Sequence, residues 1–120
     1  MNLVFIELMA FSKYRAEHLT DEEYRALQNE LLLNPEKGDI IQGINGLRKL
    51  RIADSQRNKG KRGGARVIYY YFANRDKLYF FTAYGKNKQT DLTNDQKQLL
   101  KWWAEYIKKY EEMNNDYYII

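Results

Sequence analysis

The amino-acid sequence predicts an α+β fold: a small antiparallel sheet in one domain, with elements in the order β-α-α-β-β-β-α. At 120 residues the chain is long enough for one hydrophobic core and too short for two. Two capping-box patterns each precede a helical repeat of apolar residues. Three strand-like segments follow one another between polar turns. We therefore expect residues 1–120 to form a single domain.

The N-terminal third predicts one strand and two helices. Residues 2–8 are rich in Val, Phe and Ile, which suits a strand, and residues 11–17 suit a short helix. Thr20 and Glu23 form a capping box, so a second helix is expected to start there. That helix must end before Pro35, because the residue preceding a proline is pushed out of the helical region.

Three strands are predicted in the middle of the chain. A loop with three glycines, residues 36–46, leads to the alternating segment LRKLRIA at 47–53. The aromatic and β-branched run ARVIYYYFA occupies 65–73, and the polar residues 74–77 are typical of a turn before LYFFTAY at 78–84. We expect these strands to pair in sequence as a meander.

The last predicted element is a long helix that begins at a second capping box, Thr93 to Gln96. Its apolar residues recur at helical spacing, and we expect this stripe to face the core. The stripe consists of Leu99, Trp103, Tyr106, Tyr110 and Met113. Trp102 lies at its edge as a candidate contact for a partner. The helix is expected to end at Asn114-Asn115, with residues 114–120 as a loose tail.

The positive charge of the chain is concentrated in one segment. Residues 48–66 carry eight Lys or Arg and one carboxylate, a net charge of +7, whereas the whole chain has a net charge of +4. Concentrated charge of this kind favours nucleic acid over a small acidic substrate. Within the segment, residues 54–64 combine charges with three glycines and are expected to form a flexible basic insert.

The composition excludes several kinds of chemistry. The chain has no cysteine and a single histidine, His18, so disulfides, thiolate catalysis, cysteine-bound zinc and a Ser-His-Asp triad are not expected. We expect no cofactor and no metal. The N-terminus lacks the features of a signal peptide, and no apolar run approaches 18 residues. A cytoplasmic protein without a membrane partner is the expectation.

The candidate site lies on one face of two predicted strands. Side chains two residues apart in a strand share a face, so Lys49 and Arg51 point the same way, and Arg66 joins them from the next strand. Like charges across a sheet repel one another, and no acid lies between Asp54 and Asp76 to compensate them. The alternative is an ordinary solvated face, but this uncompensated crowding favours a binding site.

The segment after the last strand adds Lys86, Asn87, Lys88 and Thr90 to these cations. A set of cations, a hydroxyl and an amide without an imidazole suits RNA cleavage by the RNA's own 2′-hydroxyl. In that reaction the protein stabilises the extra negative charge on the phosphoryl oxygens. Alone, this segment is an ordinary basic loop; with the strand cations it predicts a site.

Several motifs in a fixed order resemble HigB-type toxins of the RelE superfamily. They are LNPExGDxIxG, GLRKLRIA, KRGGxR, VIYYY and YGKNxxxDLT, and the resemblance extends from about Val4 to Tyr106. It implies a small α+β fold with an antiparallel sheet and a ribosome-dependent mRNA endoribonuclease. It also implies contacts with 16S rRNA and a HigA-type antitoxin with a helix-turn-helix domain.

The resemblance also implies roles for individual residues. Lys49 and Arg51 would orient the phosphate and assist proton removal, and Arg66 would stabilise the pentacovalent state. The leaving side would be positioned by Lys86, Asn87 and Lys88. We expect the RNA-binding residues to be Arg48, Lys59, Lys61, Arg62, Tyr84 and Thr90. The alternative for Lys59, Lys61 or Arg62 is to replace catalytic groups that the family pattern has and this chain lacks. Where the family pattern has an arginine and a tyrosine, this chain has Asn87 and Thr93.

Two other functions remain open on the sequence. A ParE-like gyrase poison would share the fold, but the presence of Lys49, Arg51 and Arg66 argues against it. A non-enzymatic nucleic-acid-binding module would leave RNA intact, whereas attack by a 2′-hydroxyl leaves a 2′,3′-cyclic or 3′-phosphate end.

Overall fold

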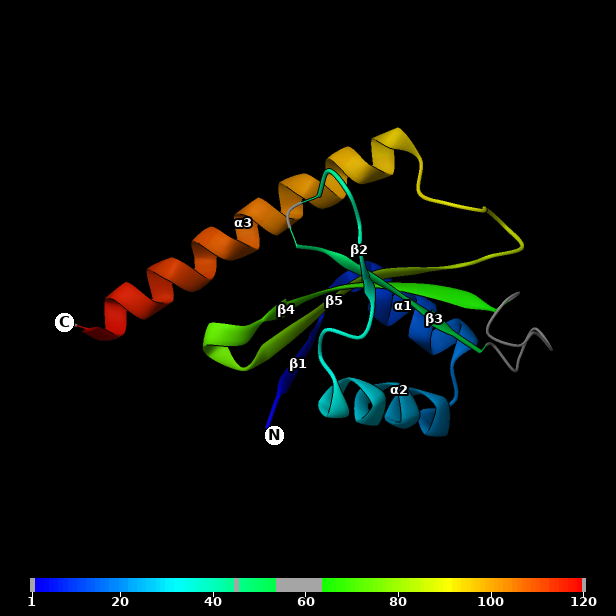
Figure 1. Cartoon of the computed structure of the whole chain (residues 1–120), viewed down its shortest axis with the longest axis horizontal. Helices are drawn as coiled ribbons and strands as arrows, with labels where there is room; N and C mark the ends of the chain where they lie inside the picture. The colour runs from blue at the N-terminus through cyan, green and yellow to red at the C-terminus, as the bar shows by residue number, and fades with distance from the viewer. Residues whose placement is uncertain (1, 45, 54–63, 120) are drawn as a thin grey trace.

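The protein is described by a computed structural model that covers residues 2–44, 46–53 and 64–119, with side chains up to residue 113. Its elements follow the predicted order with one additional strand (Figure 1). They are β1 (Val4–Glu7), α1 (Met9–His18), α2 (Asp21–Leu33), β2 (Asp39–Ile40), β3 (Arg48–Ile52), β4 (Ala65–Phe72), the 3₁₀ turn η2 (Ala73–Arg75), β5 (Lys77–Gly85) and α3 (Asn94–Ile119). Apart from Gly64, the predicted insert 54–64 lies outside the described residues.

The sheet has five strands in the order β1-β5-β4-β3-β2. The predicted antiparallel meander of β3, β4 and β5 is confirmed. The sheet is antiparallel except at one edge, where β1 lies parallel to β5 with Val4 opposite Lys77. Strand β2 also lies within the predicted loop, with Asp39 opposite Lys49. Two residues are too few to show an alternating pattern, which explains why the sequence did not reveal this strand.

Helices cover both faces of the sheet (Figure 1). Helices α1 and α2 pack on one face through a core that includes Phe11, Leu31, Leu50, Val67 and Phe80. Helix α3 packs on the other face through a second core that includes Leu47, Ile68, Phe81, Leu100 and Ile107. Alternate residues of the central strands therefore enter opposite cores. None of the helices in the described part of the chain is long and apolar enough to cross a membrane.

Both predicted capping boxes are confirmed. The Glu23 amide donates to Thr20 Oγ1 at 3.1 Å, and the Thr20 amide donates to Glu23 Oε1 at 2.9 Å. At the start of α3, the Gln96 amide donates to Thr93 Oγ1 at 3.1 Å and the Thr93 amide to Gln96 Oε1 at 2.9 Å. Helix α3 then continues to Ile119, beyond the predicted end at Asn114-Asn115.

The predicted core face of α3 is wrong. Leu99, Tyr106, Tyr110 and Met113 are each at least half exposed, and Trp103 is 38% exposed. The face that packs on the sheet lies one position further along the helix. It consists of Leu100, Ala104, Ile107 and Glu111. The large apolar stripe that the sequence assigned to the core is therefore on the surface.

Candidate functional site

The strand register brings the predicted cations together. Arg51 of β3 lies directly opposite Arg66 of β4, and Lys49 lies two residues before Arg51 on the same face. Leu50 and Val67 enter the α1–α2 core on the other face, as predicted. The predicted cationic face of the sheet is therefore confirmed.

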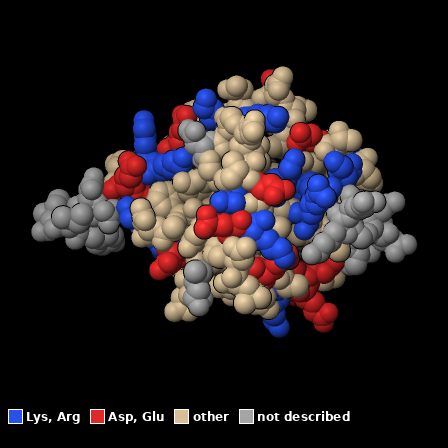
Figure 2. Space-filling model, in the orientation of Figure 1, with Lys and Arg blue, Asp and Glu red and all other residues tan. Residues whose placement is uncertain are grey.

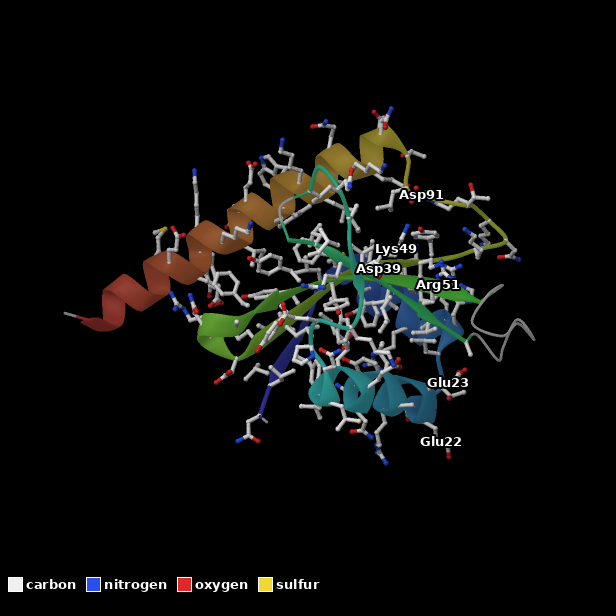
Figure 3. The ribbon with its side chains drawn as sticks, in the orientation of Figure 1. Glu22, Glu23, Asp39, Lys49, Arg51 and Asp91 are labelled. Carbon is white, nitrogen blue, oxygen red and sulfur yellow. The ribbon has the colours of Figure 1, made fainter. Side chains whose placement is uncertain are left out.

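This face opens into a cleft of about 360 Å³. Its walls come from β2 and the segment after it, β3, β4, the loop after β5 and the start of α3. The lining residues are Asp39, Ile40, Ile41, Gln42, Lys49, Arg51, Arg66, Lys86, Asp91 and Lys97. In Figure 2, basic atoms gather on the right of the face shown, with acidic atoms beside them. Figure 3 shows Asp39, Lys49, Arg51 and Asp91 in the same region.

Two carboxylates enter this cleft from distant parts of the sequence. Asp91 Oδ1 lies 3.4 Å from Lys49 Nζ, and Asp39 lies on β2 beside the same lysine. The expectation that these cations are uncompensated is therefore wrong. The backbone amide of Leu92 and the ammonium of Lys49 hold the pKa of Asp91 below its ordinary value, so this carboxyl group is ionised at neutral pH.

The loop after β5 is fixed by its own hydrogen bonds. Lys86 Nζ donates to the Thr90 carbonyl at 2.8 Å. Gln89 Nε2 donates to the Asp91 carbonyl at 2.7 Å and to Gln96 Oε1 at 2.9 Å, which ties the loop to the first turn of α3. The loop therefore holds Lys86 and Asp91 at the edge of the cleft.

Arg66 is the most buried cation of the cleft. It is 4% exposed, and its Nη1 donates to the Ala65 carbonyl at 3.2 Å. In the sheet it lies between Arg51 on one side and Tyr84 on the other. A buried guanidinium held by the surrounding protein loses little freedom when it binds an anion, so Arg66 is well suited to stabilise developing charge.

Tyr84 lies beneath this site and not on its surface. The side chain is 8% exposed and packs in the α3-side core. The sequence predicted that Tyr84 binds RNA, but the buried ring is not accessible to it. Burial raises the pKa of the Tyr84 hydroxyl, with a further increase from Asp91 that Arg66 opposes. This hydroxyl has no hydrogen-bond partner among the described residues.

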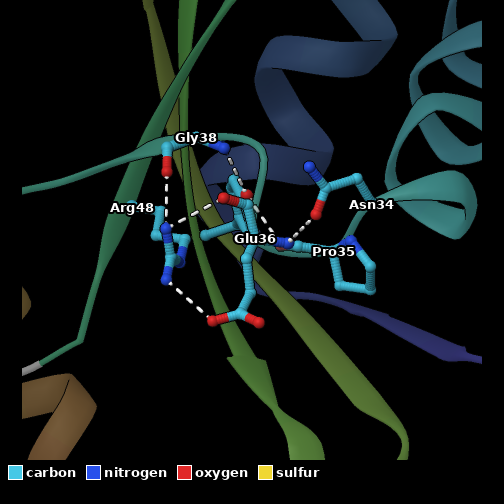
Figure 4. A network of polar contacts seen from close by, with 6 residues as sticks. Asn34, Pro35, Glu36, Gly38 and Arg48 are labelled. Carbon is cyan, nitrogen blue, oxygen red and sulfur yellow. Dashed lines mark hydrogen bonds and ion pairs between the residues drawn. The ribbon is translucent and has the colours of Figure 1, made fainter.

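Arg48 was predicted to bind RNA, but it lies outside the cleft and contacts the segment after α2. It alternates with Lys49 and therefore points to the opposite face of the sheet. Its Nη1 donates to the carbonyls of Glu36 and Gly38 at 2.9 and 2.7 Å, and its Nη2 lies 3.1 Å from Glu36 Oε2 (Figure 4). These contacts hold the segment that follows α2.

The remaining predicted residues lie outside the cleft or outside the description. Asn87, Lys88 and Thr90 are exposed in the loop after β5 and do not line the cleft. Lys59, Lys61 and Arg62 lie outside the described residues. Conversely, sequence reasoning missed Asp39, Gln42, Asp91 and Lys97. Asp91 belongs to the YGKNxxxDLT motif, which was the available signal, but pattern alone did not place it beside Lys49.

The cleft can hold a phosphodiester and can also accept a proton. Guanidinium and ammonium groups from four segments converge on a volume large enough for a nucleotide phosphate and part of its sugar. The carboxylates of Asp39 and Asp91 provide proton acceptors beside these cations.

Comparison with known proteins gives a family and a fold. Residues 9–117 match the family model described as RelE toxin of the RelE/RelB toxin–antitoxin system. The intact E. coli RelBE toxin–antitoxin complex contains a similar chain: TM-score 0.50, 15% identity, 68% of this chain and 94% of that chain covered. A mutant of the E. coli toxin RelE in the free state matches with TM-score 0.50 and 15% identity, over 75% and 90% of the two chains. At this identity the two structures support the α+β fold alone.

Proposed function

We propose, because the chain belongs to the RelE family of toxins from toxin–antitoxin systems, that it is a HigB-type endoribonuclease that cleaves translated mRNA in the ribosomal A site. Such cleavage inhibits translation, and the proposed location is the cytoplasm. The observation that carries the proposal is the direct pairing of Arg51 with Arg66 across two strands. The cleft around this pair is lined by five cations and two carboxylates, so the positive charge exceeds the negative and favours a bound polyanion.

In the proposed reaction the 2′-hydroxyl of the RNA attacks the adjacent phosphorus, and the bond from phosphorus to the 5′-oxygen breaks. Negative charge increases on the phosphoryl oxygens as the pentacovalent state forms. Arg66 and Arg51 would stabilise this charge, and Lys49 would orient the phosphate. Lys86 would face the leaving side. Asn87 and Lys88, in the exposed turn beside Lys86, would contact the flanking RNA.

In the proposed reaction the ribosome holds the mRNA in the attack geometry, which the open cleft alone does not impose. None of the described lining residues is a histidine, so fast cleavage depends on a substrate that is already held near its attack geometry. We propose that the A site holds the mRNA in this way. Lys59, Lys61 and Arg62 of the basic insert would contribute contacts with 16S rRNA.

The test is cleavage by the purified protein of mRNA on programmed ribosomes, followed by mapping of the new 5′ ends. The proposal expects cuts within the A-site codon and upstream fragments that carry a 2′,3′-cyclic or 3′-phosphate. RNA that is bound but intact would indicate a non-enzymatic binding module. Intact mRNA together with inhibition of DNA gyrase would indicate the ParE-like alternative.

We further propose that its partner is an antitoxin with a helix-turn-helix domain, of HigA type. The E. coli toxin RelE has been solved together with its antitoxin, which supports an antitoxin as the partner. The helix-turn-helix, HigA-type class of that antitoxin is what the resemblance to HigB-type toxins implies. The exposed face of α3 is the proposed docking surface. Trp102 is 55% exposed, and its ring stacks on that of Tyr106 at a centroid distance of 5.6 Å.

The spacing of this face favours a helical partner. Its exposed apolar residues follow one another at intervals of four, three, four and three residues, which is the repeat of a helix–helix seam. They are Leu99, Trp103, Tyr106, Tyr110 and Met113. Beside them, an apolar groove of about 710 Å³ runs between the start of α1, β5 and α3. An amphipathic helix of the antitoxin would bury both surfaces.

A further inference from the structure

The proposed reaction requires a group that removes the proton from the 2′-hydroxyl. Arginine does not give up its proton in proteins, and a lysine at its ordinary pKa is an ammonium ion at neutral pH. The chain's single histidine, His18, is at the end of α1 and does not line the cleft. Among the described lining residues, the carboxyl groups of Asp39 and Asp91 are therefore the candidate proton acceptors.

The two carboxylates differ in how they are held. The Asp91 carboxylate is fixed by two contacts on the same oxygen: Oδ1 accepts from the Leu92 amide at 2.8 Å and lies 3.4 Å from Lys49 Nζ. Its Oδ2 accepts no hydrogen bond from any described residue and is available to a substrate. Asp39 is an exposed residue of a two-residue edge strand, and its carboxylate makes no ion pair within the described part of the chain.

We propose that Asp91 is the general base of the cleavage reaction, a further catalytic residue that rests on the proposed function. Asp91 takes the proton of the 2′-hydroxyl as the bond between the 2′-oxygen and phosphorus forms. The bond between phosphorus and the 5′-oxygen breaks, and the leaving oxygen takes a proton from a cleft ammonium, Lys49 or Lys86. Proton exchange with water then restores the carboxylate and the ammonium.

The surroundings of Asp91 suit this role. The charged groups that face it and Lys49 come from every wall of the cleft. They are Asp39 of β2, Arg51 of β3, Arg66 of β4, Lys86 of the loop after β5 and Lys97 of α3. Most of these groups are cations, so the carboxylate stays ionised, at the cost of some intrinsic basicity. The same cations bring the phosphate to within reach of the base.

Single-turnover cleavage on programmed ribosomes, measured between pH 6 and pH 8, tests the assignment. The wild-type rate should not change with pH in this range, since Asp91 is ionised throughout it. Asp91→Asn should lower the rate by about 10²–10³-fold, and the remaining rate should rise about tenfold per pH unit because hydroxide replaces the lost base. Asp91→Glu should recover part of the rate with a level profile. Binding to the ribosome should not weaken in either variant.

Two further variants separate the base from the loss of a charge. Asp95→Asn removes a carboxylate from the first turn of α3, outside the cleft, and should cleave at the wild-type rate. Asp39→Asn removes the rival carboxylate and should cost less than tenfold, with a level pH profile. A large loss with Asp39→Asn, or a level profile with Asp91→Asn, overturns the assignment. If wild-type protein does not cleave at all, the proposed function itself fails, a result that needs no variant to detect.

Discussion

The carboxylate of Glu111 in α3 is fully buried and lies 2.8 and 2.9 Å, by its two oxygens, from the ammonium of Lys77 at the start of β5. The Tyr79 hydroxyl donates to the same carboxylate at 2.6 Å. This network fastens the second half of α3 to the β4–β5 hairpin. It explains why a charged residue lies on the face of the helix that packs on the sheet.

Replacing Glu111 with alanine should lower the free energy of unfolding by about 3 kcal/mol, because Lys77 and Tyr79 lose their partner in a mostly buried site. Urea denaturation measures the change. Glu112→Ala removes the neighbouring exposed carboxylate and should stay within about 0.5 kcal/mol of wild type. Equal effects of the two substitutions would contradict the structural role of Glu111.

The same network predicts how stability depends on pH. Burial alone raises the pKa of Glu111, but the hydrogen bonds from Lys77 and Tyr79 outweigh it, so the folded-state pKa lies below the ordinary value of 4.5. A lowered acid pKa contributes stability above pH 4.5, and this contribution is lost as the pH falls through the folded-state value. The difference in Tm between wild type and Glu111→Gln should therefore narrow between pH 6 and pH 3.

Arg66→Ala should abolish growth arrest and lower the rate of mRNA cleavage on the ribosome about 10²–10³-fold. The reason is that the negative charge of the transition state loses its most buried hydrogen-bond donor. Since Arg66 is buried, its truncation also tests the fold, and circular dichroism must accompany the assay. Arg66→Lys keeps the charge but loses the planar pair of donors, so it should retain the fold and only part of the activity. Arg25→Ala, on the exposed face of α2, is the matched control. Full toxicity of a folded Arg66→Ala protein would remove the proposed role.

Purified protein should leave free mRNA intact at physiological salt and cleave the same mRNA once it is bound to a programmed ribosome. The reason is that positioning of the substrate contributes a large part of the rate when no imidazole is available. Time courses of cleavage of free mRNA and of ribosome-bound mRNA measure the two rates. Comparable rates on the two would show that the cleft needs no help from the ribosome.

The antitoxin complex should survive ~0.5 M salt, where the Debye length falls to a few ångströms, because aromatic burial and not charge is expected to hold it. Trp103→Ala should weaken binding by about 2 kcal/mol in a calorimetric titration. Gln98→Ala, an exposed position on the same helix, serves as the control. If affinity collapses with salt, and charge reversal at Lys49 and Arg66 prevents assembly, the antitoxin covers the cleft instead.

Local patterns predicted most of the fold. The two partners of each capping box are only three residues apart in the sequence. The strands of the meander are joined by one short turn and one insert, so residues close in sequence carry the information. Period-two alternation was enough to place Lys49, Arg51 and Arg66 on one face. The RelE-superfamily resemblance was confirmed by the family match.

The missed features depend on contacts between distant residues. Asp91 is 42 positions from Lys49, and no local pattern reports that separation. In α3, two stripes with the same spacing lie side by side, and the buried one contains Ala104 and Glu111. The sequence predicted that the stripe with Trp103 and Tyr106 faces the core, because that stripe has more large apolar side chains. In the structure the other stripe packs on the sheet, because the small side chain of Ala104 lets the helix lie close to the strands and Glu111 forms an ion pair with Lys77.

The parallel pairing of β1 with β5 has a consequence for how the chain is made. Val4 pairs with Lys77, and Glu7 with Phe80, so the first strand to leave the ribosome has no sheet partner until more than half of the chain has followed. Strand β5 itself carries the loop that presents Lys86 and Asp91. The edge strand and the cleft are therefore completed by the same late segment of synthesis. The cleft cannot form until the chain has been synthesised as far as Lys97, the last of its described lining residues.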